Sequence, residues 1–397
     1  MKIVQAVILA GGQGKRLKPF TANNPKPMLP VNGKPFIEHL IILLKNNRIK
    51  EIVILTGYLG EKIEKYLGDG SKFGIKIKYS YTPFLNESGK ENESGLRLKN
   101  AQYLLDDFFL LLYCDNYWPL NLEKLTGFFK THPSDILVTA YSNLDNSTKN
   151  NILADSFGYV SKYDKTRQEQ NLNGVDIGFF IVNKKVLKLL PRSNSQFEKI
   201  VLPELVKNKR LSAYLTDQKY YSIGDLKRAQ LLAKFISDKK VVFLDRDGVI
   251  NKKPPKAEYV KNWNEFEFLP GAIEAIKLLT DKGYKIFIIS NQPGIARGAL
   301  SKKDIDYIHK KMALVFKNNG GEIDGIYICP HGWDEGCNCR KPKPGLLLQA
   351  SREHLIDLTN AIFIGDDKRD IEAGHVVGCK TLFIDGRNLL LKVVKQL

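Results

Sequence analysis

The chain has 397 residues, of which 43% are hydrophobic and 26% are charged. This composition is typical of a globular protein, and the length predicts two or three domains. No run approaches roughly 18 consecutive apolar residues, and no cleavage site follows the apolar start of the chain. We therefore expect a cytoplasmic protein with no membrane span and no membrane partner.

The formal net charge is +18, from 61 basic and 43 acidic residues. A strongly basic chain is also typical of nucleic-acid-binding proteins, which are a different class. Net charge bears on association, however, and does not predict a fold. The lysines are spread over the whole chain, and no helix-turn-helix, zinc-finger or RNP pattern accompanies them. We expect no nucleic-acid partner, and a basic surface also suits phosphosugars and nucleotides. The oligomeric state does not follow from the sequence.

Apolar runs typical of strands alternate with helical segments in the first part of the chain. This alternation is typical of an α/β domain with a largely parallel sheet. The predicted strands are Val4–Ala10, Glu51–Thr56, Ile75–Tyr81, Phe108–Cys114, Asp135–Tyr141 and Val175–Val182, and predicted helices include Pro35–Asn46 and Gly60–Tyr66.

A second α/β series begins at Val241–Leu244, shortly after a helical pattern over Leu226–Ser237. Further strands are predicted at Tyr284–Ser290, Ile326–Cys329, Ala361–Gly365 and Lys380–Ile384. Helices between them are predicted at Ala272–Lys282, Lys303–Asn318, Gly345–Glu353 and Asp370–Val377. We expect one domain over residues 1–238 and a second over 239–397.

A glycine loop with Gly11, Gly12 and Gly14 follows the first predicted strand. Glycines let backbone amides approach a phosphate closely. The loop lacks the dinucleotide spacing, and Arg16 stands where a Walker A loop needs Ser or Thr. Arg16 and Lys26 suit attack of a sugar phosphate on a nucleotide, because this reaction brings two anions together and expels pyrophosphate.

The run Leu9–Pro27 resembles the signature of the sugar-nucleotide pyrophosphorylases at every fixed position. The resemblance implies a sugar-1-phosphate nucleotidyltransferase with a Rossmann-like domain built on a mixed sheet. It also implies that the three glycines cradle the nucleotide. Arg16 would lie at the departing pyrophosphate and Lys26 at the reacting phosphates.

The same family holds Mg²⁺ between two aspartates, and Asp115, at the end of a hydrophobic strand, matches the first. Ser222 occupies the place of the second, so Asp225 is the candidate substitute. Gly95 is what remains of a Gly-Thr-Ala-Gly segment that shapes the base and sugar pocket. Asp176 stands where the family has an asparagine that touches the sugar. The resemblance therefore implies the type of reaction more firmly than the substrate.

A second group of polar residues follows the strands of the C-terminal series. Asp245 and Asp247 end the first strand, where one carboxylate can attack phosphorus and the other can protonate the leaving alcohol. The pair Asp366-Asp367 can help to hold Mg²⁺. Further along lie donors and cations for phosphate oxygens, namely Ser290, Asn291, Arg340 and Lys341.

This half resembles the haloacid dehalogenase superfamily of phosphatases over Val241–Ile384, which implies a parallel sheet. Its motifs Asp245–Asn251, Ser290–Ile295, Cys339–Gly345 and Gly365-Asp366 are most similar to the D-glycero-D-manno-heptose 1,7-bisphosphate 7-phosphatases. The resemblance implies an Asp245 nucleophile, an Asp247 acid and base, and Mg²⁺ held by Asp245, Asp247 and Asp366. Phosphate and substrate would be bound by Asn251, Ser290, Asn291, Gln292, Arg340 and Lys341.

Three cysteines and a histidine crowd into residues 329–339, namely Cys329, His331, Cys337 and Cys339. Cys₃His is a set typical of structural zinc sites, and four protein ligands leave no open position for catalysis. We expect structural Zn²⁺ that braces the loop leading into Arg340 and Lys341. The alternative is a loop with free cysteines.

The two resemblances fit one another, because the phosphatase would release a sugar 1-phosphate and the transferase would consume one. They imply a bifunctional enzyme that converts heptose 1,7-bisphosphate to heptose 1-phosphate and transfers a nucleotidyl group to it. GTP is favoured as the nucleotide by analogy with the family's pathway. Another sugar or base, such as mannose 1-phosphate, CTP or dTTP, is one alternative. A first domain that senses sugar nucleotides without catalysis is another.

Overall fold

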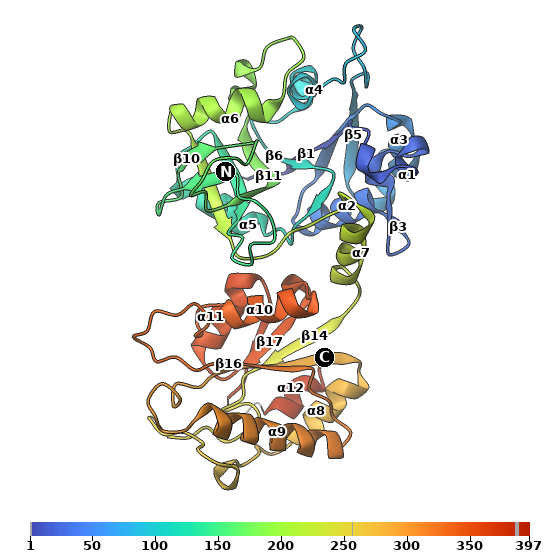
Figure 1. Ribbon diagram of the computed structural model, residues 1–397. Coiled ribbons are helices and arrows are strands. Elements are labelled where there is room, and N and C mark those ends of the chain that lie inside the picture. Colours follow the sequence, from blue (N-terminus) through green and yellow to red (C-terminus); the bar gives the residue numbers. More distant parts are fainter. Residues whose placement is uncertain (1, 256, 386–388) are drawn as a thin grey trace. The chain divides into compact units, whose positions relative to one another are not determined.

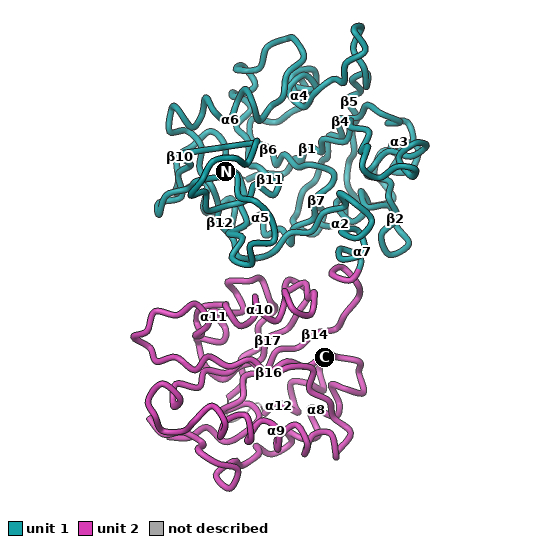
Figure 2. Tube along the Cα trace, in the orientation of Figure 1, with its two compact units in different colours: residues 1–233 teal, residues 234–397 magenta. Residues whose placement is uncertain are grey.

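The chain folds into two compact units, residues 1–233 and 234–397 (Figure 2). The structure is a computed structural model and describes residues 2–255, 257–385 and 389–397. Both units are α/β, as predicted, and each has a buried core of its own.

Unit 1 is built on a seven-stranded mixed sheet (Figure 1). The strand β11 runs antiparallel to both of its neighbours, whereas the other pairs are parallel, which confirms the predicted mixed sheet. In spatial order the strands are β12 (Leu211–Thr216), β8 (Ile136–Tyr141), β11 (Val175–Asn183), β6 (Phe108–Tyr113), β1 (Gln5–Ala10), β4 (Glu51–Thr56) and β5 (Lys76–Tyr81).

The interior strand β1 is buried along its whole length, as expected for a strand of a sheet with both faces covered. Side chains of α4 and α6, such as Leu98 and Val201, share one buried cluster with Val7 and Leu55 of the sheet. The helices of this unit are α1 (Phe20–Asn23), α2 (Phe36–Asn46), α3 (Gly60–Leu67), α4 (Ser94–Ala101), α5 (Leu122–Thr131), α6 (Phe197–Lys207) and α7 (Leu226–Phe235), the last of which crosses into unit 2.

In the described part of unit 1, three short two-stranded ribbons are separate from the main sheet. One of them pairs Asn116 with Ser222, so it brings the segment after β6 beside the segment before α7. The ribbons are β2 (Pro30–Val31) with β3 (Lys34–Pro35), β9 (Ile152–Ala154) with β10 (Val160–Tyr163), and β7 (Asn116–Tyr117) with β13 (Tyr221–Ser222).

Unit 2 is built on a five-stranded parallel sheet, which confirms the predicted parallel sheet. Its strands are, in spatial order, β16 (Gly325–Cys329), β15 (Tyr284–Asn291), β14 (Lys240–Leu244), β17 (Ile362–Gly365) and β18 (Lys380–Phe383). Its helices are α8 (Ala272–Asp281), α9 (Lys302–Asn318), α10 (Gly345–His354), α11 (Lys368–Val377) and α12 (Leu390–Val394).

Alternation along β14 distributes its side chains between two cores. Val242 and Leu244 pack in the cluster that contains α8, α9 and α12, whereas Val241 and Phe243 pack in the cluster that contains α10 and α11. Because the strands are parallel, the carboxyl ends of β14, β15 and β17 meet at one edge of the sheet. Open α/β sheets bind their ligands at this edge.

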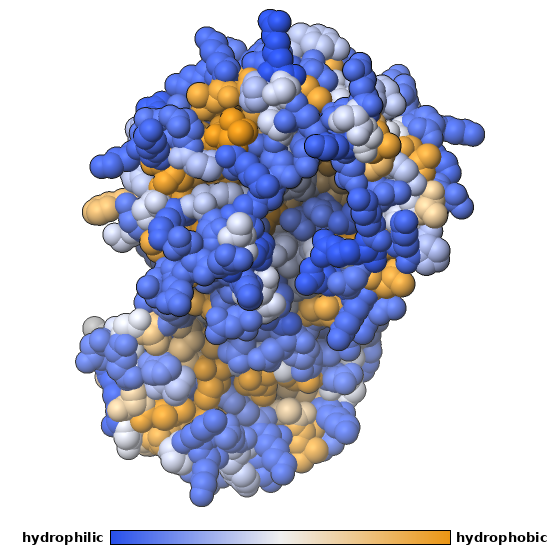
Figure 3. Space-filling model, turned by 45° about the horizontal axis from the view of Figure 1, so that its top comes forward, coloured by the Kyte–Doolittle hydropathy of each residue, from blue (hydrophilic) through white to orange (hydrophobic). Residues whose placement is uncertain are grey.

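Hydrophilic residues cover most of the face shown in Figure 3, and hydrophobic residues are interspersed among them in small groups. Within the described residues, none of the helices combines the length and the apolar character that crossing a membrane requires.

Candidate active sites

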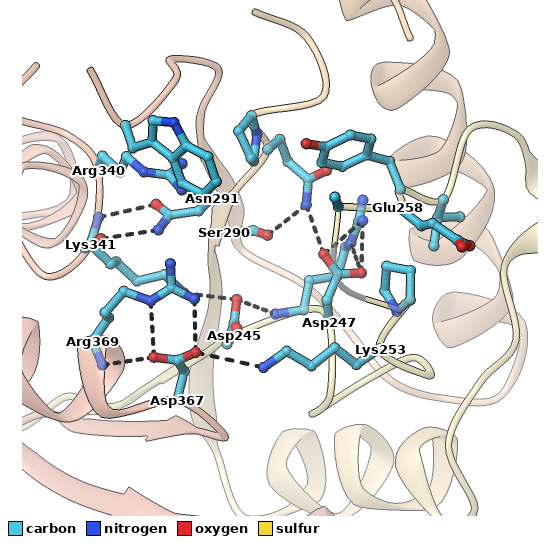
Figure 4. A pocket seen from close by; sticks show the side chains of 18 of the residues that line it. Asp245, Asp247, Lys253, Glu258, Ser290, Asn291, Arg340, Lys341, Asp367 and Arg369 are labelled. Carbon is cyan, nitrogen blue, oxygen red and sulfur yellow. Dashed lines mark hydrogen bonds and ion pairs between the residues drawn. The ribbon is translucent and has the colours of Figure 1, made fainter. Parts of the chain in front are cut away.

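A cavity of about 550 Å³ opens at the carboxyl edge of the unit 2 sheet (Figure 4). The cavity brings together residues that are up to 125 positions apart in the sequence, from Asp245 to Asp370. Among the predicted site residues, its lining includes Asp245, Asp247, Ser290, Asn291, Gln292, Arg340 and Lys341.

Lys341 is buried at the base of this cavity between two carboxylates. Its Nζ lies 2.8 Å from Asp245 Oδ1 and 2.6 Å from Asp370 Oδ1, and it donates to the carbonyl of Ile289 at 2.8 Å. Burial alone would lower the pKa of Lys341, but attraction to Asp245 and Asp370 outweighs it and raises that pKa. Burial raises the pKa of Asp245 to about 6, against the opposing effect of Lys341. The buried ammonium is therefore charged and lies where a phosphoryl group would need a cation.

The carboxylate of Asp247 is held by three donors. Arg246 Nη2 lies 2.8 and 2.9 Å from its two oxygens, and the amides of Asn251 and Gln292 each donate to it at 2.9 Å. Burial would raise the pKa of Asp247, but the Arg246 charge and these hydrogen bonds lower it. Arg246 is itself fully buried and also contacts His309 Nε2 at 3.2 Å. The geometry fixes Asp247 in one orientation in the cavity.

Asp245, Asp366 and Asp370 form a cluster whose carboxylate oxygens lie within 4.8 Å of one another. Asp366 Oδ2 accepts from Lys253 at 2.7 Å, whereas its Oδ1 is buried and has no hydrogen-bond partner in the described part of the chain. A buried carboxylate oxygen without a donor suits a hard cation such as Mg²⁺. Asp247, the third Mg²⁺ ligand that the resemblance implied, is not one of this group, and Asp370 was not expected in it.

Asn291 links β15 to the segment that carries Arg340 and Lys341. Its side chain accepts from the Lys341 amide at 3.0 Å and donates to the Lys341 carbonyl at 3.2 Å. Gln292 donates to Ser290 Oγ at 2.8 Å, and Arg340 donates to the carbonyl of His331 at 3.2 Å. Asn291 thus positions the chain around Lys341.

The predicted zinc ligands lie together in unit 2. Cys329 Sγ is 3.6 Å from both His331 Nδ1 and Cys337 Sγ, and His331 Nδ1 is 3.2 Å from Cys339 Sγ. With bonds of about 2.0–2.3 Å, tetrahedral ligands around Zn²⁺ stand roughly 3.3–3.8 Å apart. The spacing of the four side chains therefore fits one zinc ion.

In unit 1, the glycine loop, Lys26 and Asp115 lie together. Lys26 is buried, and its Nζ lies 2.7 Å from Asp115 Oδ2. Gly14 has a φ of +70°, and a Cβ there would lie 2.8 Å from Lys26 Cβ. Only glycine satisfies both demands without strain. The loop therefore packs directly on the lysine that the sequence places at the reacting phosphates.

Beneath this loop lies Arg97, a buried residue of α4 that sequence reasoning missed. Its Nη1 donates to the carbonyls of Thr56 at 2.7 Å and Thr82 at 2.8 Å, and its Nη2 donates to the carbonyl of Gly11 at 3.4 Å. A Cβ on Gly11 would lie 2.3 Å from the guanidinium carbon. Arg97 therefore ties together the chain segments that follow β1, β4 and β5.

Arg16 is exposed and lies near the turn before α7. A Cβ on Gly224 would lie 3.8 Å from Arg16 Nη2 and 3.7 Å from Ser222 Oγ. Asp225, the candidate second metal ligand, accepts from the Arg228 amide at 2.8 Å and pairs with the Arg228 side chain at 3.3 Å. It therefore caps α7 in this structure, and its role as a ligand stays a prediction.

Asp176, which the sequence predicts to contact the sugar, is half-buried, and the carboxylate of Glu198 is buried. Asp176 accepts from the Tyr163 hydroxyl at 2.8 Å, and burial raises its pKa. Glu198 of α6 accepts from Tyr113 and, at 3.1 Å, from Ser94, and burial raises its pKa as well.

Gly95 lies beside Ser94, and its amide donates to the Ser195 carbonyl at 2.8 Å. This hydrogen bond joins the start of α4 to the segment before α6. The sequence did not single out Glu198, although the structure connects it to Ser94.

Two family models match the chain. The nucleotidyl transferase family matches residues 5–235, more than half of the chain, and a model described as polynucleotide kinase 3 phosphatase matches residues 240–376.

Curated relatives include two bacterial phosphatases. The D-glycero-beta-D-manno-heptose-1,7-bisphosphate 7-phosphatase of Pseudomonas putida is 39% identical over 145 residues, which cover 36% of this chain and 82% of that protein. The D-glycero-alpha-D-manno-heptose-1,7-bisphosphate 7-phosphatase of Mycobacterium bovis is 41% identical over 137 residues, which cover 34% of this chain and 72% of that protein.

A solved Bacillus anthracis structure, assigned as a glucose-1-phosphate thymidylyltransferase, is 22% identical and has a TM-score of 0.51. The match covers 59% of this chain and 97% of that one, and it shows a shared fold. The chain thus belongs to the nucleotidyl transferase family and, through its C-terminal part, to the family of the heptose-1,7-bisphosphate 7-phosphatases.

Proposed function

We propose that this protein is a bifunctional enzyme that removes the 7-phosphate of D-glycero-D-manno-heptose 1,7-bisphosphate and transfers GMP from GTP to the resulting heptose 1-phosphate. The observation that carries the proposal is the pairing of the two families in one chain. The product of a heptose bisphosphate 7-phosphatase is a sugar 1-phosphate, which is the substrate class of the other half.

In the phosphatase half, the Asp245 carboxylate attacks phosphorus and forms an aspartyl-phosphate, while Asp247 protonates the departing sugar oxygen. Asp247 then takes a proton from the water that hydrolyses the intermediate. A phosphate dianion beside Asp247 favours its protonated form, since like charges raise a carboxyl pKa. Lys341 and the Ser290 hydroxyl bind the phosphoryl oxygens, and Asn291 keeps the segment of Lys341 in place.

We propose Mg²⁺ in both halves. In unit 2 it would be held by Asp245 and Asp366, because the buried Asp366 Oδ1 lacks a donor and Asp370 adds a third carboxylate to the cluster. In unit 1 it would be held by Asp115 together with phosphate oxygens, with Asp225 as the proposed second ligand. The ion supplies positive charge that stabilises the phosphoryl groups during reaction.

In the transferase half, Lys26 offsets the charge of the reacting phosphates and Arg16 that of the departing pyrophosphate. Lys26 is already fixed by its packing on Gly14 and its ion pair with Asp115. A cation held in place before the substrate arrives loses little free energy to reorganisation during the reaction. The half-buried Asp176 and the buried Glu198 offer acceptors for sugar hydroxyl groups.

The proposed function is tested by incubating the full chain with heptose 1,7-bisphosphate and Mg²⁺, with GTP, CTP, dTTP, ATP or UTP in separate reactions. Both anomers are used, because the curated relatives include enzymes for each. We expect phosphate release without nucleotide, and pyrophosphate release with GTP. Preference for CTP or dTTP would replace GTP as the proposed nucleotide. Nucleotide binding without pyrophosphate release would indicate that unit 1 senses sugar nucleotides without catalysis. Absence of phosphate release would overturn the proposed phosphatase activity of unit 2.

For the cysteine loop, we propose structural Zn²⁺ at Cys329, His331, Cys337 and Cys339. Purified protein is expected to contain about one zinc per chain, as in other Cys₃His sites, and Cys337→Ser is expected to lose it, as measured by atomic emission. Cys379→Ser, which removes a buried cysteine outside this cluster, is the matched control. Full zinc content in the Cys337 variant would contradict the assignment.

A further inference from the structure

The helix α9 carries a histidine on the face that it buries in unit 2. Ile305, Ile308 and Met312 recur at helical spacing on this face and pack in the cluster that contains alternate side chains of β14. His309 lies on the same face, and only 6% of its surface is exposed. Burying a polar ring costs free energy unless the ring is hydrogen-bonded. The helix therefore tolerates His309 because the ring has a partner inside the domain.

The partner recorded for His309 among the described residues is Arg246, the residue between Asp245 and Asp247. Arg246 Nη1 lies 3.2 Å from His309 Nε2. A guanidinium has no acceptor, so Nε2 accepts, and the imidazole is neutral with its proton on Nδ1. Burial and the charge of Arg246 lower the pKa of His309 to about 3, which keeps the ring in this neutral form.

The other nitrogens of the Arg246 guanidinium face the carboxylate of Asp247. Nε donates to Oδ1 at 3.2 Å, and Nη2 donates to Oδ1 at 2.8 Å and to Oδ2 at 2.9 Å. His309 thus binds the one guanidinium nitrogen that Asp247 does not. A planar group held from both sides cannot turn without leaving a buried donor unsatisfied, which is costly. His309 therefore fixes the plane in which Arg246 meets Asp247.

The two oxygens of Asp247 differ in their donors. Oδ1 accepts from two nitrogens of Arg246 and from Asn251, whereas Oδ2 accepts from one nitrogen of Arg246 and from Gln292. The same Gln292 amide donates to Ser290 Oγ, so it links Oδ2 to a proposed phosphate ligand (Figure 4). A general acid must present its proton toward the leaving group. Oδ2 is the oxygen with fewer donors and the one on the phosphate side.

We propose that His309 is a positioning residue of the phosphatase, which fixes Arg246 and thereby holds Asp247 with Oδ2 as the oxygen that carries the proton. When the substrate reacts, the bond from phosphorus to the sugar oxygen breaks as the bond to Asp245 forms, and the proton on Oδ2 goes to the sugar oxygen. His309 does not line the cavity and exchanges no proton. This inference rests on the proposed phosphatase activity and deepens it.

The test varies the leaving group, because a sugar alkoxide needs a proton when it departs and p-nitrophenolate does not. His309→Phe keeps a ring but offers no acceptor. In the full chain it is expected to lower kcat/KM for heptose 1,7-bisphosphate by about 10- to 100-fold, as for a lost hydrogen bond to a charged group, and kcat/KM for p-nitrophenyl phosphate by less than about 3-fold. His309→Gln, whose amide oxygen can accept from Arg246, is expected to retain most of the activity with both substrates.

His354→Phe is the matched control. It removes a histidine of α10 that contacts Tyr327 outside the cavity lining, and it is expected to change neither value. Equal losses with both substrates in His309→Phe would assign His309 a general structural role, and an unchanged value for the bisphosphate would exclude any role in the reaction. Either result overturns the proposal. If circular dichroism shows that His309→Phe does not fold, His309→Leu takes its place.

A second measurement adds His309→Phe to Asp247→Asn and follows phosphate release in a single turnover. If His309 acts through Asp247, the added substitution lowers the rate by less than about 3-fold, because residues that act as a unit are not additive. A further loss as large as in the wild type would contradict the proposal.

If the wild type leaves heptose 1,7-bisphosphate intact, the proposed function fails, and fructose 1,6-bisphosphate replaces it as the sugar ester in the same comparison. Crystal structures of the wild type and His309→Phe need no substrate. We expect Arg246 to turn away from Asp247 in the variant. An unchanged Arg246–Asp247 geometry would overturn the positioning role even if the phosphatase activity is confirmed.

Discussion

Replacement of Asp245 by Asn is expected to stop phosphate release from heptose 1,7-bisphosphate. An amide of the same shape cannot attack phosphorus, and loss of a nucleophile lowers turnover by roughly 10⁴- to 10⁶-fold. The substitution keeps the side-chain volume in a buried position, so the fold of unit 2 is expected to persist. The measurement is phosphate release under single-turnover conditions, with the same protein assayed for nucleotide transfer to heptose 1-phosphate.

Asp245→Asn is expected to transfer nucleotide at the wild-type rate, because the residues proposed for nucleotide transfer all lie in unit 1. Asp281→Asn, an exposed carboxylate of α8 that pairs with Lys277, is the matched control and should leave both reactions intact. Substantial phosphatase activity in Asp245→Asn would show that another group attacks the phosphate.

Replacement of Lys26 by Ala is expected to lower nucleotide transfer by on the order of 10²- to 10³-fold, as for other preorganised groups that stabilise charge in a transition state. The lysine is buried against Gly14, and its ammonium pairs with Asp115. The loss should appear in kcat more than in KM for the nucleotide, since the charge builds up during transfer. Pyrophosphate release and phosphate release are measured in the same preparation.

Phosphate release by Lys26→Ala is expected to be unchanged, which separates the two reactions in the opposite sense from Asp245→Asn. Lys45→Ala removes an exposed cation of α2 and serves as the control for charge. A thermal melt followed by circular dichroism checks that the unpaired Asp115 has not unfolded unit 1. Transfer at the wild-type rate in a folded Lys26→Ala protein would rule out the proposed role.

Most of the sheet could be predicted because buried strands such as β1 and β14 are near-continuous apolar runs, which have few other structures open to them. The direction of β11 could not be derived from its own residues, since antiparallel and parallel strands share this pattern. The resemblance predicted a mixed sheet but not which strand runs antiparallel. The edge strand β12 was missed because its outer end is partly exposed and mixes apolar with polar residues.

The candidate sites were predictable where their residues adjoin a strand end in a recognisable motif, as Asp245 and Lys26 do. Arg97 and Glu198 carry no such signal, because their contacts join segments that are 86 and 104 residues apart. Asp370 had a weaker signal: it lies in the first turn of α11, shortly after the strand end that is followed by Asp366. Only the fold brings these groups to their sites.

The partners of Arg97 also bear on how the two halves tolerate acid. Its guanidinium is held by carbonyl oxygens of Gly11, Thr56 and Thr82, which do not take up protons in the range where carboxylates do. Lys341 is paired instead with Asp245 and Asp370. When the pH falls below the raised pKa of Asp245, about 6, protonation removes the charge of this partner. Because the raised pKa lets the folded protein take up this proton more readily than the unfolded chain, protonation of Asp245 should not destabilise unit 2 but should remove the charge with which Asp245 attacks phosphorus, while the glycine loop of unit 1 keeps the support of Arg97.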